Sequence, residues 1–321
     1  MRRRWVRIVA ILVGILAVLL VALLVALRIT APTVDVGAPQ ERKPVPASWL
    51  MSEDTPAARP GTSSPESSVQ TSSATVAASD DRPAPFATTG ALAFYGRGRP
   101  FGEELYEIRL DADGLTLSST GQFRFRAVVA TLRVAFEQRL EADDRLIPTR
   151  YEAAFDAPLG FDRRVSAEIT DGVARIASGN AERAIDVDGD AVILGTFATY
   201  ALLPVLFPLR ERDGMASFDV LALGGPPGTE EETSNLPPMS VERLAPIRIL
   251  SEEQTIVVDA YLVESTLGES LLLAKGREFV ALVAGTSDES LAVYRSDFFP
   301  DGFEILDRVD RLPSLSASTV P

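Results

Sequence analysis

The feature that most constrains this chain is an uncharged apolar run, IVAILVGILAVLLVALLVAL, from Ile8 to Leu27. At about 1.5 Å of rise per residue, a helix of this length spans roughly 30 Å, the thickness of a bilayer's hydrocarbon core. A helix also satisfies its own backbone amides, as lipid requires. Arginines flank the run unevenly, with Arg2, Arg3, Arg4 and Arg7 before it and Arg28 after it. We therefore predict a cytoplasmic Arg cluster and a single-pass signal-anchor helix within residues 1–28, with the C-terminal domain extracytoplasmic in the cell envelope.

A cleaved signal peptide is the alternative interpretation of the same run. Signal peptides have shorter apolar regions, usually about 7–15 residues, and end in small residues at the cleavage site. Here the run is longer, and cleavage after Ala31 would place Ile29 at the −3 position and Pro32 directly beyond the cut. Both interpretations export the rest of the chain.

Composition excludes several classes of function. The chain has no Cys and no His, which excludes disulfides, thiol nucleophiles, imidazole metal ligands and Ser-His-Asp catalysis. Its net charge of −14 disfavours nucleic acid as a partner. We therefore expect no enzyme activity, no cofactor, no metal and no catalytic residue.

Residues 29–89 are rich in Pro, Ser and Thr and have no apolar periodicity. Such composition cannot offset the entropy of ordering, so we predict a disordered linker that acts as a stalk. One apolar cluster interrupts it, at residues 49–51 (Trp-Leu-Met). The cluster is either incidental or a short docking motif for a partner or the membrane surface.

From residue 90 onward, apolar and polar residues alternate in segments that turn residues separate. Tyr106, Ile108 and Leu110 alternate with charged residues, the sequence Asp-Ala-Asp-Gly follows at 111–114, and Leu115 begins the next such segment. This pattern is typical of antiparallel hairpins with one apolar face. We predict a mainly β domain at residues 90–312, a curved antiparallel sheet or open barrel with one short apolar helix, and a disordered tail at 313–321.

The stretch from Ala191 to Leu209 lacks this alternation and carries no charge. It is a helix buried against the sheet, a helix that lines an apolar cavity, or a second membrane span, although its two prolines weaken the last option. Helical spacing makes four residues the candidates for lining a ligand cavity: Phe197, Tyr200, Leu203 and Phe207.

Three short segments carry a family resemblance. They are a strand from Gly102 to Ile108, a Leu-Ile-Pro-x-x-Tyr strand from Leu146 to Tyr151, and Phe218-Asp219-Val220 after the apolar helical stretch. In this order the chain resembles bacterial envelope proteins of the DUF3108 kind, with a curved sheet similar to that of lipoprotein carriers such as LolA, over roughly residues 90–300. The resemblance implies a periplasmic or extracellular β domain that can receive an apolar ligand, and it supplies no catalytic residue.

Other motifs are weak. Asp186-x-Asp188-Gly189-Asp190 departs from the spacing of a calcium loop and favours a hairpin turn. The basic stretch from Gly96 to Pro100 favours a surface turn, and a Ser–Lys dyad would have to use Lys275. The predicted function is therefore a membrane-anchored, non-enzymatic envelope domain that binds an apolar or lipid-like ligand. The alternatives are a protein–protein interaction module and, with less support, a carboxylate-based glycan hydrolase.

Overall fold

The computed structural model describes most of the C-terminal domain and a few residues before it. The described residues are 84–126, 131–158, 162–179, 181–187, 191–223, 235–265, 268–284, 291–309 and 319–320, together with Lys43, Val45, Trp49 and Leu312. The predicted membrane helix at residues 1–28 lies outside them. Among the described helices, none has the length and apolar character needed to cross a bilayer.

Strands dominate the structure. The first eight are β1 (Phe86–Gly96), β2 (Arg99–Asp111), β3 (Gly114–Arg126), β4 (Thr131–Ala142), β5 (Pro148–Asp156), β6 (Arg163–Thr170), β7 (Val173–Ser178) and β8 (Ala181–Asp186). After them come β9 (Val192–Leu194), the 3₁₀ helix η3 (Phe197–Leu202), the α-helix α2 (Leu203–Arg210), β10 (Met215–Ala222) and β11 (Asn235–Arg243). The last seven are β12 (Ile247–Ser251), β13 (Gln254–Ser265), β14 (Gly268–Lys275), β15 (Glu278–Ala284), β16 (Leu291–Arg295), β17 (Phe303–Ile305) and β18 (Thr319–Val320).

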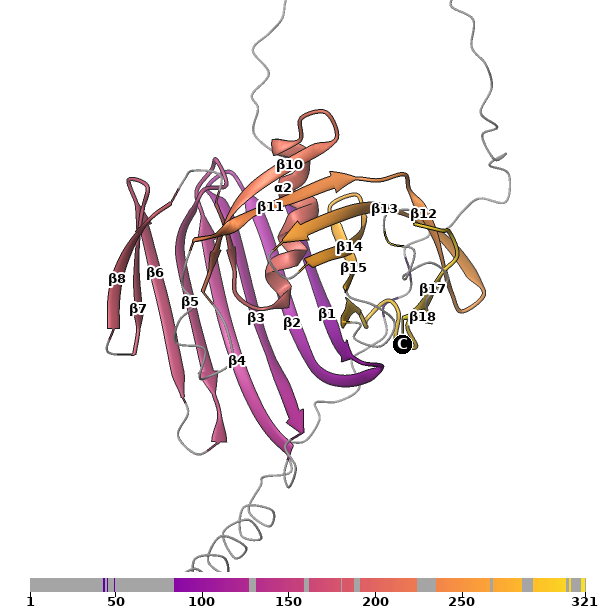
Figure 1. Ribbon diagram of the computed structural model, residues 1–321, viewed down its shortest axis with the longest axis horizontal. Helices are drawn as coiled ribbons and strands as arrows, with labels where there is room; N and C mark the ends of the chain where they lie inside the picture. The colour runs from indigo at the N-terminus through magenta and orange to yellow at the C-terminus, as the bar shows by residue number, and fades with distance from the viewer. Residues whose placement is uncertain are drawn as a thin grey trace, which may run out of the picture.

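Two antiparallel meanders join into one continuous curved sheet. Strands β1 to β8 pair in sequence order, and β13 to β16 do the same. The meanders meet where β1 pairs with β16, and the sheet continues from β13 through β11 to β10, with β9 parallel to β10. Figure 1 shows the sheet bending so that β10 and β11 pass across α2, which lies inside the curve. The prediction of a mainly β, open and curved sheet with one short helix is confirmed.

The apolar stretch at 191–209 forms β9, η3 and α2 on the concave face. Most residues of η3 and α2 are buried, and their surroundings are the inward side chains of the sheet. The helical path is short: Pro204 lies in the first turn of α2, and Pro208 stands inside the helix near its end. A second membrane span at this position is therefore wrong: the stretch covers the sheet of its own domain.

Two cores lie on opposite faces of the sheet. The first fills the concave face and includes η3, α2 and the inward residues of β2 to β7. The second lies behind β13 to β16, where β12, β17 and the segment after β16 cover the sheet. The prediction of a sheet with one covered face is correct for β2 to β7 but wrong for β13 to β16, whose burial patterns are nearly continuous. A second layer of chain, which no alternation reveals, accounts for the difference.

Segments predicted to be disordered contribute residues to the domain. Strand β1 begins at Phe86, before the predicted boundary at residue 90. Trp49, from the predicted stalk, is buried in the second core, and Val45 packs against it. Val320, from the predicted tail, is buried there as well and pairs with β17. Trp49 and Val320 share a feature that local patterns do not reveal, because single apolar residues in polar segments can complete a core that lies far away in sequence.

Strand β11 contains two prolines, Pro237 and Pro238, which local sequence patterns disfavour within a strand. Proline cannot donate a ladder hydrogen bond and is found at edges and bulges. The register between β10 and β11 shifts between Phe218 and Val220, opposite these prolines. The bulge therefore accommodates both.

Candidate functional site

The four predicted ligand-lining residues belong to the packed concave core. Phe197 lies in an aromatic cluster, with its ring centroid 4.7 Å from that of Phe94. Leu203 and Phe207 are fully buried, whereas Tyr200 is partly buried against the same core. The void described beside α2, next to Leu202 and Leu206, holds about 10 Å³. That volume is at the lower limit for one water molecule, so at this point the helix fills the curve of the sheet.

A buried polar network ties η3 to four strands of the sheet. Glu104 of β2 accepts hydrogen bonds from the Ser119 hydroxyl (2.5 Å), from the Thr196 hydroxyl and from the backbone N–H of Ala198 (3.0 Å). Gln138 of β4 donates to Thr196 and accepts from the Tyr151 hydroxyl (3.2 Å) and from the backbone N–H of Thr196 (3.1 Å). The network therefore fixes the start of η3, whose Thr196 N-cap makes no cap bond of its own.

Burial raises the pKa of Glu104 to about 7, although the hydrogen bonds from Ser119, Thr196 and Ala198 oppose the rise. Gly195 leaves the room that the network needs. A Cβ at that position would lie 2.1 Å from the Tyr151 hydroxyl and 2.5 Å from Oε1 of Gln138. Sequence alternation could have located Glu104, because it occupies the same face of β2 as Tyr106 and Ile108.

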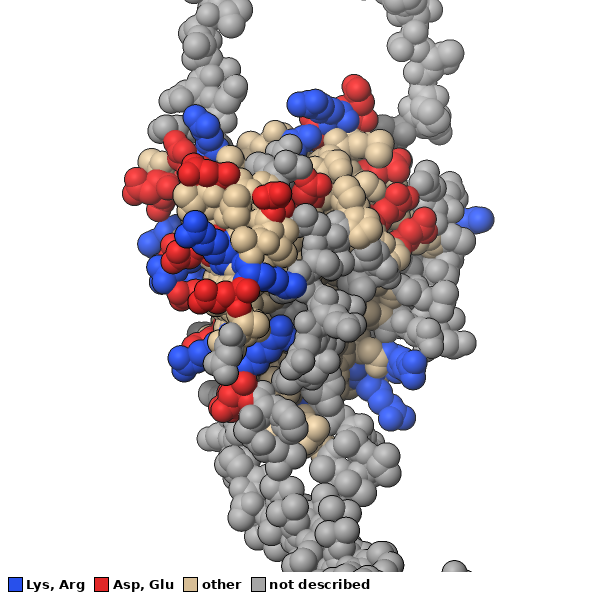
Figure 2. Space-filling view, turned by 60° about the vertical axis from the view of Figure 1, so that its left-hand side comes forward, with Lys and Arg blue, Asp and Glu red and all other residues tan. Residues whose placement is uncertain are grey.

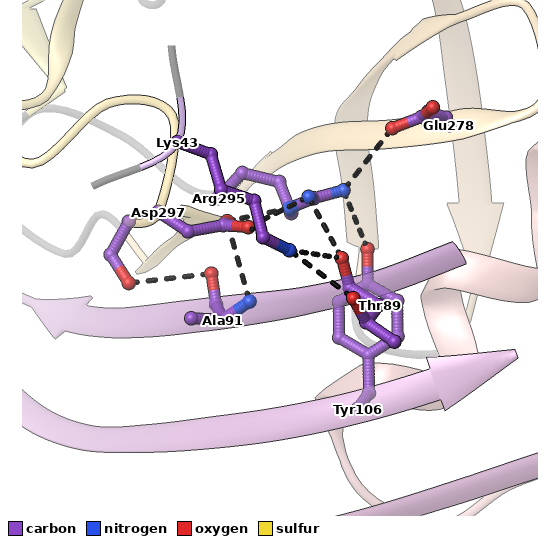
Figure 3. Close-up of polar contacts among 8 residues, drawn as sticks. Lys43, Thr89, Ala91, Tyr106, Glu278, Arg295 and Asp297 are labelled. Carbon is purple, nitrogen blue, oxygen red and sulfur yellow. Dashed lines mark hydrogen bonds and ion pairs between the residues drawn. The ribbon is translucent and has the colours of Figure 1, made fainter. Parts of the chain in front are cut away.

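A second buried polar cluster centres on Arg295 of β16, which is 1% exposed. Its guanidinium donates two hydrogen bonds to Asp297 (2.7 and 2.8 Å) and one each to the Tyr106 hydroxyl and the Thr89 carbonyl (both 3.1 Å). Figure 3 shows these groups with Glu278, which forms an ion pair with Arg295 (3.5 Å). The cluster joins β1, β2, β15 and β16 at the seam between the two meanders.

Electrostatics keep this cluster ionised. Burial lowers the pKa of Arg295, but the hydrogen bonds and charge of Asp297 outweigh it, so the pKa lies above its usual range. Burial likewise raises the pKa of Asp297, but Arg295 outweighs it and holds the pKa below its ordinary value. Burial raises the pKa of Tyr106 to about 12. A fixed ion pair of this kind organises the fold and has no free group for chemistry.

Lys43 and Trp49 attach the N-terminal region to this cluster. The Lys43 ammonium contacts the Thr89 carbonyl (3.0 Å) and the Asp297 carboxylate (3.3 Å), and the Lys43 backbone N–H donates to the Asp297 carbonyl (3.1 Å). The Trp49 ring packs edge-on against Phe298, with centroids 5.1 Å apart. Phe298 lies in turn 4.2 Å below the Arg295 guanidinium. Trp49 therefore docks on its own domain.

The solvent-facing side of the N-terminal meander carries a hollow of about 1120 Å³. Strand register aligns its residues in two rows across the sheet. One row runs Thr89, Glu107, Ser118, Arg139, Glu152 and Ser166, and the other runs Leu105, Thr120, Glu137, Ala154 and Arg164. Figure 2 shows basic and acidic side chains interspersed along one side of the molecule. This outer-face hollow is open to solvent and has charged and hydroxyl side chains in its lining, unlike the concave face.

The hollow combines charge with one exposed apolar side chain. Leu105 is 48% exposed, although it lies in the middle of a strand. Four carboxylates (Glu107, Glu137, Glu152 and Asp162) and two guanidiniums (Arg139 and Arg164) line the hollow. Arg139 pairs with Glu141 (2.8 Å), and Glu152 pairs with Arg150 (2.5 Å). Among the described residues, Glu107, Glu137 and Arg164 form no ion pair.

The weaker motifs have structural explanations where they are described. Arg97 and Gly98, both with positive φ, form the two-residue turn between β1 and β2, as the surface-turn interpretation predicts. Lys275 donates to the Val257 carbonyl (2.7 Å) rather than to a serine. Asp186 ends β8, whereas residues 188–190 of the calcium-like sequence lie outside the described residues. Within the described residues, no three acidic side chains converge as metal ligands would.

Comparison with protein-family models and with curated proteins finds no match. Among solved structures, the chain is similar to a β-barrel-like protein of the domain of unknown function DUF1849 from Brucella abortus, with 11% identity over 70% of this chain and 99% of that one, at a TM-score of 0.44. It is also similar to a DUF1089 family protein from Pseudomonas aeruginosa, with 19% identity over 57% of this chain and 89% of that one, at a TM-score of 0.39. Likenesses at this level are informative about neither ligand nor activity. The resemblance to DUF3108 and LolA-like proteins is not among these matches.

Proposed function

We propose that this chain is a membrane-tethered, non-catalytic envelope protein whose β domain binds a protein partner in the outer-face hollow. The contrast between the two faces of the N-terminal meander carries the proposal. The concave face is filled by η3 and α2, with a void of only about 10 Å³ beside α2. The opposite face is hollowed by about 1120 Å³ and lined by charged and hydroxyl groups. A partner therefore has room on the outer face.

The same contrast disfavours the apolar-ligand carrier. A carrier encloses most of an apolar ligand in a cavity of several hundred cubic ångströms. Phe197, Leu203 and Phe207 instead make contacts within the core. A packed interior together with a large hollow on the outer face supports an interaction module over a carrier.

Charge and the exposed leucine define the partner's chemistry. Four carboxylates against two guanidiniums give the hollow an acidic balance, and the chain as a whole has a net charge of −14. Electrostatic complementarity then favours a partner surface with more Lys and Arg than acid. Leu105 stands within the hollow, where a partner's apolar side chain would desolvate it.

The predicted location of the domain, outside the membrane, is the last part of the proposal. The apolar run at Ile8–Leu27 and the arginines before it support a tether with the domain on the outer side of the membrane. The resemblance to DUF3108 envelope proteins supports the same compartment.

A glycan hydrolase is the enzymatic alternative, because carboxylates line the hollow. Such hydrolysis needs one carboxylic acid in an apolar setting, so that it can donate a proton near neutral pH. Glu107, Glu137, Glu152 and Asp162 are all solvent-exposed. The hollow therefore suits recognition better than acid–base catalysis.

Photocrosslinking in the native host tests this proposal. A benzophenone amino acid at Thr120, inside the hollow, should form an adduct of defined mass with one envelope protein. The same group at Arg133, an outward-facing position of β4 that lies outside the hollow, should form no such adduct. Leu105→Arg should remove the adduct, whereas Leu132→Arg, which changes an exposed leucine outside the hollow, should keep it. The proposal is overturned by an adduct that ignores Leu105→Arg, by no adduct at all, or by a lipid retained in native mass spectra of the protein.

A further inference from the structure

The domain holds a segment of its own N-terminal region at two points. Lys43 and Trp49 attach to the chain that follows β16, and Val45 packs against the second core. We name Lys43, Val45 and Trp49 the clasp. These residues precede β1 and are joined to it through residues 50–83, which lie outside the described residues.

The clasp has a built receptor. Asp297 is 4% exposed and is already held by Arg295, so its carboxylate is oriented before Lys43 contacts it. Phe298 lies between the Arg295 guanidinium and the Trp49 ring. Trp49 itself is 7% exposed. One end of the clasp is therefore recognised by charge and the other by an aromatic contact, which fixes both its position and its direction.

The position of the clasp changes the reach of the tether. Between the predicted membrane helix and Lys43 stand residues 28–42, which reach at most roughly 55 Å when fully extended. Between the same helix and β1 stand residues 28–85, which reach at most roughly 200 Å. When the clasp is closed, residues 28–42 alone set the greatest distance between the domain and the membrane. The longer segment that leads to β1 then sets no limit.

We propose that the clasp is a non-covalent joint that holds the domain close to the membrane, so that the outer-face hollow meets a membrane-proximal partner. The proposal uses the membrane tether of the proposed function, but the joint itself depends only on Lys43, Val45 and Trp49 and their receptor. It assigns Trp49, the first residue of the predicted docking motif at 49–51, an intramolecular role. It also makes the effective start of the domain Lys43, well before β1.

Cleavage of the chain between the clasp and β1 tests the joint directly. A specific endoprotease site placed between Val69 and Gln70 of the full chain allows cleavage after folding. In detergent solution, the N-terminal fragment and the domain should then elute together. The double variant Lys43→Glu, Trp49→Ala should release the fragments at least tenfold faster. Lys275→Glu with Trp5→Ala changes the other lysine and the other tryptophan, and should behave like the parent chain.

A fluorescence measurement keeps the test valid if the double variant folds poorly. With Trp5→Phe, Trp49 is the sole tryptophan, since the chain has two. Its emission should be blue-shifted and protected from acrylamide in the intact chain, and Asp297→Asn should shift it to the red. The joint is refuted if the parent fragments separate as fast as the double variant, or if Trp49 emits as in water.

Energy transfer in vesicles tests the reach. The chain has no Cys, so Glu269→Cys gives a single labelling site on the domain. Transfer from this dye to acceptor lipids should be strong in the parent chain and should fall when the clasp is opened by Lys43→Glu and Trp49→Ala. Equal transfer in both would overturn the proposal that the clasp holds the domain close to the membrane. A chain that does not associate with vesicles but keeps its cut fragments together would refute the membrane tether and leave the joint standing.

Discussion

The two meanders of the sheet have the same connectivity but differ in what covers them. Strands β2 to β7 alternate between buried and exposed residues, because only their concave face is covered. Strands β14 and β15 are buried on both faces, since β12, β17 and the segment around Phe299 form a second layer behind them. Identical hairpin pairing thus produces two surfaces with different uses. The first meander has a solvent-exposed outer face, to which we propose that a partner binds, whereas the outer face of the second is covered by its own chain.

Each meander also buries ionisable groups, and in different ways. Glu104 in β2 is buried with neutral hydrogen-bond donors and, within the described part of the chain, has no basic partner. Arg295 in β16 is buried with Asp297 and stays charged. A buried charge is tolerated when it is paired, whereas an unpaired carboxyl becomes neutral instead. The two networks should therefore respond differently to pH.

The largest expected effect lies at an outer position of the doubly covered meander. Leu271 of β14 belongs to the second core and is fully buried. Leu271→Ala should lower the free energy of unfolding by about 2–5 kcal/mol, because it removes packed methyl groups and leaves a cavity. Glu137→Ala, at an outward position of β4, is the matched control and should leave the value nearly unchanged. Chemical denaturation measures both, and a small effect at Leu271 would mean that the second layer does not cover β14.

Glu104 should make the stability fall as the pH rises. The folded protein holds the proton up to about pH 7, whereas the unfolded chain releases it near pH 4.5. The contribution of the neutral carboxyl is therefore complete below pH 4.5, decreases between pH 4.5 and 7, and is lost above that range. The full change is about 3 kcal/mol by linkage. Denaturation midpoints measured from pH 4.5 to 8 give the slope.

Glu104→Gln is the control for this pH dependence. The amide keeps hydrogen-bonding capacity toward Ser119, Thr196 and the Ala198 N–H but does not titrate. The variant should match the parent chain near pH 4.5 and exceed it at pH 8. Asp297 titrates in a separate window, because its lowered pKa affects stability only under more acidic conditions. An unchanged slope in Glu104→Gln would assign the pH dependence to another group.

Tyr106→Phe should have a smaller effect at the seam between the meanders. It removes the hydroxyl that accepts a hydrogen bond from Arg295 (3.1 Å) but keeps the ring in place. The expected loss is about 1–2 kcal/mol, since one donor of a buried guanidinium loses its partner. Thermal unfolding would show it. A loss as large as that of Leu271→Ala would indicate that the whole Arg295 cluster had rearranged.

Much of this fold was predictable from local patterns, because alternation and Asp-Gly turns encode each hairpin directly. The hairpin of β2 and β3, with its turn at Asp111–Gly114, is one such case. The second layer was not predictable, because it depends on pairing between distant segments such as β12 and β17. The clasp was hidden for the same reason, since Trp49 finds its partner Phe298 at the other end of the chain. Glu104 and Leu105 did carry a signal: strict alternation places the acid in the core and the leucine in solvent.

A substitution at Leu105 should have the smallest effect on stability. It also gives the sharpest test of whether the outer face of the N-terminal meander serves for binding. It occupies a mid-strand position on the solvent side of β2, opposite Thr120, and is 48% exposed. If it serves the partner rather than the fold, Leu105→Ser should change the free energy of unfolding by no more than about 0.5 kcal/mol. The same variant should strongly weaken photocrosslinking from Thr120, because the apolar contact within the hollow is lost. A loss of more than about 1 kcal/mol would show instead that Leu105 is held by its own sheet, and would remove the clearest sign that this meander keeps its outer face for binding.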